Sequence, residues 1–226
     1  MGSKQTVAVI VAHPDDEVLA FGGSIAKHAA DGDDVHVFIM ATGLASRETG
    51  SVNEKAISAL RNQAIEAAKV LGAKETQFGD FPDNRMDEVA LLDVVKAVEA
   101  FAENVKPARV YTHHQGDLNV DHKIVAQAVL TAFRPLPGAK PVSLYSGEVL
   151  SSSEYADPSV RFAPTSYVDI ATVLEKKKWA LACYAGELRD WPHPRSIEAI
   201  EHQARLRGSE SGLDAAEALR LIREIS

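Results

Sequence analysis

Residues 6–17 have the sequence ThrValAlaValIleValAlaHisProAspAspGlu, and this stretch decides the class of fold. Apart from Thr6, its first seven residues are apolar, which is typical of a short strand buried on both faces of a parallel sheet. PheGlyGly at 21–23 follows, and then a helix is expected. The stretch therefore predicts the start of a βαβ unit. Because ligands bind at the carboxyl ends of parallel strands, residues 13–17 lie where a functional loop is expected.

The rest of the chain repeats this alternation of short apolar runs and helical patterns. Further strands are predicted at 35–41, 75–78, 109–112 and 142–149. Helices with one apolar face are predicted at 57–71, 91–105 and 119–133. Past residue 151 the pattern loosens, and helices near 172–185 and 197–207 suggest a smaller C-terminal cap region. We expect a single α/β domain over residues 1–226, Rossmann-like, with a mostly parallel sheet flanked by helices.

The composition disfavours several classes of function. Of the 226 residues, 46% are hydrophobic and 25% are charged, values typical of globular proteins rather than disordered ones. A net charge of −8 repels a phosphate backbone, so no nucleic-acid partner is expected. The longest apolar run falls far short of the roughly 20 residues that cross a membrane, which predicts no membrane span and a cytoplasmic location. The GxGxxG pattern is absent, which disfavours a nucleotide-dependent oxidoreductase.

Two predicted strand ends carry imidazoles and carboxylates. The first has HisProAspAspGlu at 13–17, and the second has HisHisGlnGlyAspLeuAsnValAspHis at 113–122. If the sheet brings them together, two histidines and a carboxylate leave positions open for water on Zn²⁺, as catalytic sites require. The chain has one cysteine, so a closed structural site built on thiolates is disfavoured. The alternative is that the acids at 15–17 are a solvated helix start that stabilises the positive end of the helix.

Several motifs together carry a resemblance to a known family. They are HisProAspAspGlu at 13–17, ThrGly at 42–43 with Arg47, PheProAspAsn at 81–84, AspLeuAsnValAspHis at 117–122, ProHisProArgSer at 192–196 and AlaGluAlaLeu at 216–219. With these motifs the chain resembles the LmbE-like, or PIG-L, family of zinc-dependent de-N-acetylases. The resemblance implies three zinc ligands, His13, Asp16 and His122. It also implies that Asp15 is the general base, which takes a proton from the metal-bound water and passes it to the leaving amine.

One position departs from the family pattern. Many members have a histidine three residues before the last ligand, and this chain has Asn119 there. An amide can donate a hydrogen bond to an oxyanion but cannot carry a proton, so we expect Asn119 to act in catalysis as a donor only. An acid role then falls on Asp15, or on His113 or His114, for which packing is an equal alternative. Asp121 is expected to orient an imidazole, or else to stabilise a helix N-terminus.

Three residues are candidates for substrate binding. Arg47 could clamp a hydroxyl, carboxylate or phosphate, or it could pair with Glu48 at the surface. Asp83 and His193 lie in two of the motifs that carry the resemblance, and we assign them the same role. The loop that contains Trp191, His193 and Arg195 could equally serve in loop packing or in contacts between copies of the chain.

The resemblance implies a hydrolase that removes an N-acetyl group from an N-acetylated amino sugar or glycoconjugate. Zn²⁺ is the expected metal, although two histidines and one carboxylate also suit Fe²⁺. A second interpretation is a metal-binding or sugar-binding protein of the same fold with little turnover. The acid at position 15 disfavours it, because a protein that only binds has no use for a base beside the metal. A homo-oligomer is expected from the resemblance.

Overall fold

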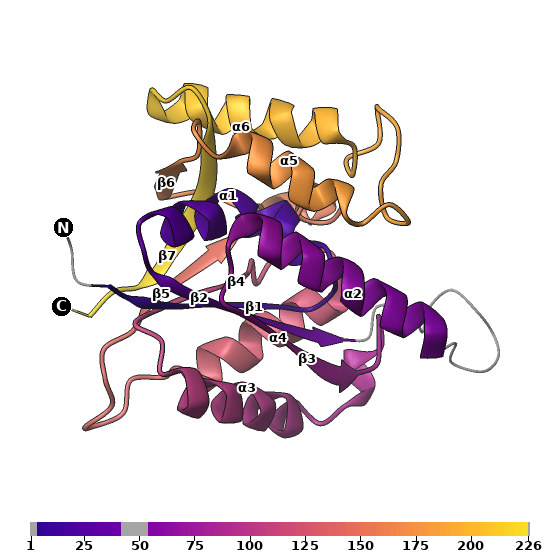
Figure 1. The fold of residues 1–226 in the computed structure, drawn as a ribbon. Coiled ribbons are helices and arrows are strands. Elements are labelled where there is room, and N and C mark those ends of the chain that lie inside the picture. The colour runs from indigo at the N-terminus through magenta and orange to yellow at the C-terminus, as the bar shows by residue number, and fades with distance from the viewer. Residues whose placement is uncertain (1–3, 42–53, 226) are drawn as a thin grey trace.

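The computed structural model describes residues 4–41 and 54–225, which form a mixed sheet covered by helices on both faces (Figure 1). Within these residues the sheet has seven strands in the order β3-β2-β1-β4-β5-β7-β6. The strands are β1 (Thr6–Val11), β2 (Asp34–Ala41), β3 (Glu75–Phe81), β4 (Arg109–His113), β5 (Ser143–Gly147), β6 (Ser166–Asp169) and β7 (Ala216–Arg223). The pairings among β1 to β5 are parallel, and β7 runs antiparallel to both of its neighbours.

The helices form layers above and below the sheet (Figure 1). They are α1 (Asp16–Ala30), α2 (Glu54–Leu71), α3 (Leu91–Val105), α4 (Val120–Ala132), α5 (Leu174–Ala182) and α6 (Ile197–Ser211), with 3₁₀ turns η1 (Met86–Glu88), η2 (Ser153–Tyr155) and η3 (Pro158–Val160). One face carries α3 and α4. The other carries α1 and α2, and α5 and α6 form a further layer on top of these two helices.

Strand β1 is buried on both faces, as its apolar sequence predicts. Val7, Val9 and Val11 belong to the core on the α1 side. Ala8 and Ile10 belong to the second core, together with apolar residues of α3 and α4. Alternate side chains of a strand point to opposite faces, so one unbroken apolar run supplies both cores.

The predicted α/β class and the five predicted strands are confirmed, and two details of the sequence analysis are wrong. Helix α1 begins at Asp16, so PheGlyGly at 21–23 lies inside it rather than before it. At Gly23 an added Cβ would lie 2.5 Å from Ile170, so the glycine lets the C-terminal part of the chain approach the helix. The predicted cap also contributes more than helices, because β6 and β7 extend the sheet.

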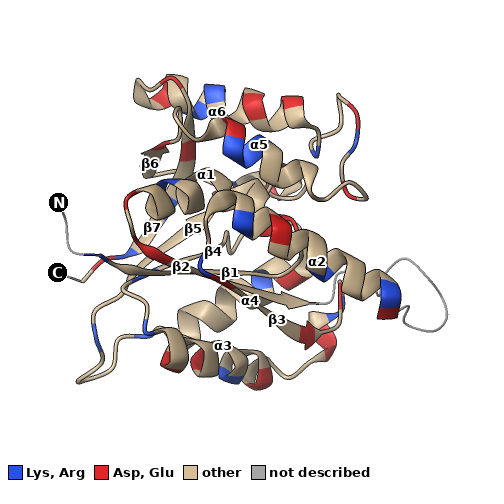
Figure 2. Ribbon diagram, in the orientation of Figure 1, with Lys and Arg blue, Asp and Glu red and all other residues tan. Residues whose placement is uncertain are grey.

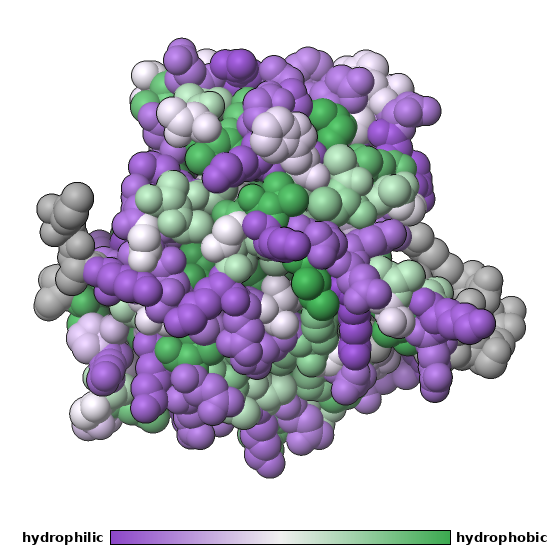
Figure 3. Space-filling view, viewed as in Figure 1, coloured by the Kyte–Doolittle hydropathy of each residue, from purple (hydrophilic) through white to green (hydrophobic). Residues whose placement is uncertain are grey.

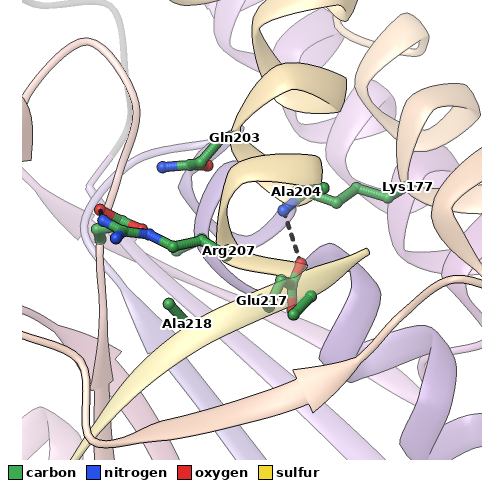
Figure 4. A pocket seen from close by; sticks show the side chains of 9 residues that line it. Lys177, Gln203, Ala204, Arg207, Glu217 and Ala218 are labelled. Atoms are coloured by element: carbon green, nitrogen blue, oxygen red, sulfur yellow. Dashed lines mark hydrogen bonds and ion pairs between the residues drawn. The ribbon is translucent and has the colours of Figure 1, made fainter. Parts of the chain in front are cut away.

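A buried ion pair joins α5 to β7 and α1 (Figure 4). Lys177 Nζ lies 2.6 Å from Glu217 Oε1 and donates to the Leu19 carbonyl at 3.0 Å. The Glu217 carboxylate also accepts hydrogen bonds from the backbone N–H groups of Gly23 and Ser24, both at 2.6 Å. Each charge is therefore met by partners, which is the condition for burying charged groups.

The charged residues are distributed along the outer helices. Figure 2 shows acidic and basic residues interspersed along α2 and α6. The face seen in Figure 3 is a mosaic in which hydrophilic residues predominate. Among the described residues, no helix is both long enough and apolar enough to span a bilayer.

Candidate metal centre

The site lies where the strand order reverses. Chain connections lead from β1 outward through β2 to β3, and the chain then returns to place β4 on the other side of β1. Because β1 and β4 are parallel neighbours, the segments after them open at the same edge of the sheet. Ligand sites of open α/β sheets lie at such a reversal. The two strand ends that carry imidazoles and carboxylates are thus brought together.

The turn after β1 is built to present His13 and Asp16. Asp15, between Pro14 and Asp16, has φ of 97°, in the left-handed region that non-glycine residues rarely occupy. Asp16 begins α1, and its Oδ2 accepts a hydrogen bond from the His13 backbone N–H at 2.8 Å. Asp15, Asp16 and Glu17 are each at most 1% exposed. Asp16 and Glu17 do lie in the first turn of α1, but the three acids are buried, so the alternative is wrong in expecting them to be solvated.

Three side-chain atoms converge as metal ligands would. His13 Nδ1 lies 3.3 Å from His122 Nε2 and 3.4 Å from Asp16 Oδ2, and His122 Nε2 lies 3.2 Å from Asp16 Oδ2. Ligand atoms held tetrahedrally at about 2.0–2.1 Å from Zn²⁺ are about 3.3 Å apart. The donor set of two imidazole nitrogens and one carboxylate oxygen therefore fits a divalent metal without rearrangement.

The outer nitrogen of each imidazole faces a carboxylate. His13 Nε2 lies 2.9 Å from Asp121 Oδ2 and 3.2 Å from Asp83 Oδ1. His122 Nδ1 lies 3.1 Å from Asp117 Oδ1. Carboxylates in this position fix the orientation of a ligating imidazole and raise its basicity. Asp121 thus lies where the sequence analysis expected an orienting acid, and Asp83 lies against the same ring rather than in an open substrate position.

The orienting carboxylates are themselves anchored. Asp121 accepts hydrogen bonds from the backbone N–H groups of Asn84 at 2.6 Å and Met86 at 3.0 Å. Asp117 accepts hydrogen bonds from the hydroxyls of Ser152 and Ser153. Each acid therefore has a fixed geometry before a metal binds.

The acids concentrate negative charge around the two imidazoles. Burial alone would lower the pKa of His13, but hydrogen bonds to Asp121 and Asp16 raise it to about 10. Burial opposes a similar rise at His122, where Asp16 and Asp117 raise the pKa to about 9. Burial also opposes ionisation of Asp16, but His122 and His113 hold its pKa well below the usual range. This environment favours positive charge between His13, Asp16 and His122.

Asp15 differs from Asp16 in its surroundings. Burial raises the pKa of Asp15 to about 7, although the Arg195 guanidinium opposes the rise. Arg195 Nη1 lies 3.4 Å from Asp15 Oδ2, and within the described part of the chain no group donates a hydrogen bond to that oxygen. Arg195 is held in turn by Glu187 at 3.1 Å and by Ser151 Oγ at 2.8 Å. A carboxyl with a pKa near neutrality suits proton transfer.

The histidines after β4 have packing partners. His113 stacks on His122, with ring centroids 3.9 Å apart, and its Nε2 accepts a hydrogen bond from the Ala12 N–H at 2.8 Å. Burial lowers the pKa of His113 to about 3, so its ring is neutral. His114 turns away to the Val160 carbonyl, 2.8 Å from its Nε2.

Asn119 has a structural task that the sequence analysis did not assign. It is the N-cap of α4, and its Oδ1 accepts hydrogen bonds from the N–H groups of Asp121 at 2.8 Å and His122 at 3.4 Å. Its Nδ2 donates to Asn84 Oδ1 at 3.0 Å. The cap places His122 in the first turn of α4, and the role of Asn119 as an oxyanion donor stays a prediction.

The remaining predicted substrate contacts are less closely joined to the centre. Arg47 lies outside the described residues. His193 is exposed, and its Nδ1 accepts a hydrogen bond from the Arg195 backbone N–H at 3.0 Å, so its contact is with the loop that holds Arg195. Trp191 packs edge-on against His202 with centroids 4.9 Å apart, which agrees with loop packing.

Asp117 and the polar groups of the C-terminal part of the chain are parts of the site that the sequence did not predict. Asp117 lies five residues before His122, in the same motif, and that proximity was a usable signal. Glu17 and Tyr184 form a buried hydrogen bond, and burial raises the pKa of Glu17 to about 8. Nothing in the local sequence around Tyr184 or Ser152 connects these residues with the first strand.

Comparison with known proteins identifies relatives of two kinds. Residues 8–133 match the family model described as PIG-L, GlcNAc-PI de-N-acetylase. The uncharacterized deacetylase YaiS of Escherichia coli K12 is 32% identical over 139 residues, 59% of this chain and 71% of that protein. The 4-oxalmesaconate hydratase of Pseudomonas putida KT2440 is 30% identical over 216 residues, 85% of this chain and 78% of the relative. The solved structure of GalB, the 4-carboxy-2-hydroxymuconate hydratase from the same strain, superposes with a TM-score of 0.79 at 26% identity, covering 98% of both chains.

Proposed function

The chain belongs to the PIG-L family, and from that membership we propose that it is a metal-dependent hydrolase that removes an N-acetyl group from an amino sugar or glycoconjugate. The observation that carries the proposal is the cluster of His13 Nδ1, Asp16 Oδ2 and His122 Nε2, whose separations of 3.2–3.4 Å suit Zn²⁺ or Fe²⁺. A divalent ion held there would activate water and polarise the amide carbonyl.

In this reaction the side chains of the site have different roles. Asp15 accepts the proton of the attacking water and returns it to the leaving amine, since burial gives its carboxyl a pKa of about 7. Asp117, Asp121 and Asp83 keep the imidazoles in place. A protein that only binds sugar would have no use for a buried acid beside the ligands. Self-association and a cytoplasmic location stay predictions from the sequence.

A second candidate is the addition of water to a carbon–carbon double bond of a small unsaturated carboxylic acid. It is favoured by the 30% identity to a hydratase over 85% of this chain. The same centre would serve, because both reactions need activated water and a group that moves a proton. Arg195, beside Asp15, offers a cation for a substrate carboxylate.

One pair of assays distinguishes the candidates. Protein loaded with Zn²⁺ or Fe²⁺ is incubated with N-acetylglucosamine, its glycosides and its nucleotide sugars, and released acetate and free amine are measured. The same preparations are incubated with 4-oxalmesaconate, and the loss of absorbance of the conjugated acid is followed. We expect acetate from at least one sugar and no change in the acid. Hydration without deacetylation would establish the second candidate, and failure to bind metal would exclude both.

A further inference from the structure

A cavity is lined in part by the segment that follows β4, the same segment that leads to the metal centre. Its volume is about 560 Å³, within the range of small-molecule sites. It lies between α4, β5, β7 and η3, and its lining includes His114, Gln115 and Gly116 of the segment after β4. It is not the metal centre, because none of the candidate ligands or their carboxylate partners lines it.

Two arginines line the cavity, and within residues 4–41 and 54–225 neither side chain has a hydrogen bond or an ion pair. Arg161 follows η3 and Arg220 lies on β7, and both line the cavity. In the part of the chain that the structure describes, every other arginine has a hydrogen bond, an ion pair or an aromatic contact. No aspartate or glutamate is among the described lining residues, although the whole chain has a net charge of −8. Two positive charges are therefore left for an anion.

The other residues that line the cavity include both polar and apolar side chains. Ser146 of β5 is 2% exposed and is one of the polar residues that line the cavity. Apolar surface comes from Leu130 of α4 together with Val160, Leu221 and Ile222, the last three 47%, 37% and 37% exposed. An anion with an apolar body would cover that surface and pair with the guanidinium groups.

Two backbone segments, at Gly116 and at Val160, pack closely at the cavity. At Gly116 an added Cβ would lie 2.3 Å from the Val160 carbonyl oxygen and 2.7 Å from His114 Nε2, so only glycine allows the two segments to meet. His114 Nε2 lies 2.8 Å from the same carbonyl oxygen. These contacts hold the backbone at Val160, the residue before Arg161, against the segment that follows β4.

We propose that this cavity is a second ligand site, which binds a small organic acid through a carboxylate held by Arg161 and Arg220 and an apolar body packed on Val160, Leu221 and Ile222. Guanidinium groups bind carboxylates in a planar, two-pronged geometry, and Ser146 adds a donor at the floor. The inference goes beyond the proposed function, since it needs neither the metal nor the reaction.

Octanoate is a suitable probe, with acetate and 1-octanol as the charge-only and chain-only controls. Isothermal titration of the full chain should give a 1:1 complex with octanoate and at least about tenfold weaker binding of either control. Arg161→Gln and Arg220→Gln should each raise the Kd at least about tenfold, because a charge-assisted hydrogen bond exceeds the 1.4 kcal/mol that corresponds to a factor of ten. Arg205→Gln, which removes the same charge from exposed α6, should leave the Kd unchanged.

Two further measurements keep the result specific. Octanoate could instead bind a metal ion, so the titration is repeated on protein stripped with chelator, where the same Kd is expected. Binding that disappears with the metal, or that persists in both arginine variants, would overturn the proposal. Light scattering tests whether a second copy covers this face. Absence of octanoate binding, together with a change of mass in the Arg161→Gln/Arg220→Gln variant, would assign the arginines to that contact instead.

Discussion

Two regions of the chain contribute different side chains to the candidate site: the N-terminal region, residues 6–147, and the C-terminal region, residues 151–225. The N-terminal region supplies the candidate ligands and Asp15 from two neighbouring strand ends. The C-terminal region supplies groups that touch these residues: Ser152 and Ser153 bond to Asp117, and Arg195 approaches Asp15. Under the proposed function the chemistry therefore resides in the first region, and the second contributes charge and hydrogen bonds around the groups that would perform it.

Removing a ligand should have the largest effect. Asp16→Ala takes away one of three protein ligands and also the acceptor of the His13 backbone N–H. We expect metal content to collapse and activity to fall to background, measured by elemental analysis and by acetate release. Asp31→Ala, a change at an exposed acid of the C-terminal end of α1, should retain both. Full metal content in the Asp16→Ala variant would show that the ligand set is wrong.

Replacing Asp15, the proposed base, should lower turnover without loss of metal. Asp15→Asn keeps the shape of the side chain but cannot accept a proton, so turnover should fall by roughly 10²- to 10⁴-fold. Metal content should stay near the wild-type value, because no ligand atom is lost. Equal metal loss in the Asp15→Asn and Asp16→Ala variants would refute the division of roles between the two aspartates, and an unchanged rate would leave Asp15 without a catalytic task.

The two regions also differ in how far the sequence predicts them. Strands β1 and β2 are predicted because parallel strands buried on both faces have nearly continuous apolar sequences. Strand β7 was missed because AlaGluAlaLeuArgLeuIleArg at 216–223 is rich in helix-forming residues, and only pairing with β5 and β6 makes it a strand. Helix and strand propensities predict secondary structure poorly where pairing with strands distant in sequence decides it.

The same difference applies to the site. His13, Asp16 and His122 are brought together as expected, since their motifs follow strands whose carboxyl ends share one edge of the sheet. The contacts of Arg195 with Asp15 and of Tyr184 with Glu17 join residues more than 160 positions apart. No local pattern contains that information, because it depends on how α5 and the loop after it pack against α1.

The attachment of the C-terminal region to α1 can be tested by stability. Lys177→Met leaves Glu217 buried without its cation, which should lower the free energy of unfolding by about 3–5 kcal/mol. Lys178→Met is the matched control, since Lys178 pairs with Glu175 and Glu201 near the surface, and about 0–1 kcal/mol is expected. Urea denaturation measures both. Equal effects of the two substitutions would mean that the Lys177 pair contributes no more than a surface pair.

A smaller effect is expected where the two regions meet at His122. Asp117→Asn keeps a hydrogen-bonding group near the Ser152 and Ser153 hydroxyls but removes the negative charge beside His122 Nδ1. Metal affinity should fall about 10- to 100-fold, the usual result of changing a carboxylate that orients a ligating imidazole. Competition with a chromogenic chelator gives the affinity. Asp157→Asn, an exposed N-cap at η3, should leave it unchanged, and an unaltered affinity in the Asp117→Asn variant would remove Asp117 from the metal centre.

A pH-dependent effect on stability is expected at the far end of α1, where His28 contacts Asp33 and Tyr111 of the N-terminal region. His28 Nδ1 lies 2.7 Å from Asp33 Oδ2, and its Nε2 lies 2.8 Å from the Tyr111 hydroxyl. Burial lowers the pKa of His28 below its usual 6.5, although Asp33 opposes the shift. The unfolded chain therefore binds the proton more readily, so the contribution of His28 to stability is complete above pH 6.5 and declines as the pH falls below that value.

Substitution of His28 tests whether its pKa is lowered in the folded protein. His28→Gln should cost about 1–3 kcal/mol at pH 7.5, because the hydrogen bonds to Asp33 and Tyr111 are weakened at a mostly buried position. At pH 5 the difference between wild type and variant should be smaller, since the wild type then has to give up or bury a proton on His28. Urea denaturation at both pH values gives the difference. A gap that widens toward pH 5 would mean that the Asp33 carboxylate outweighs burial and that folded His28 takes up the proton.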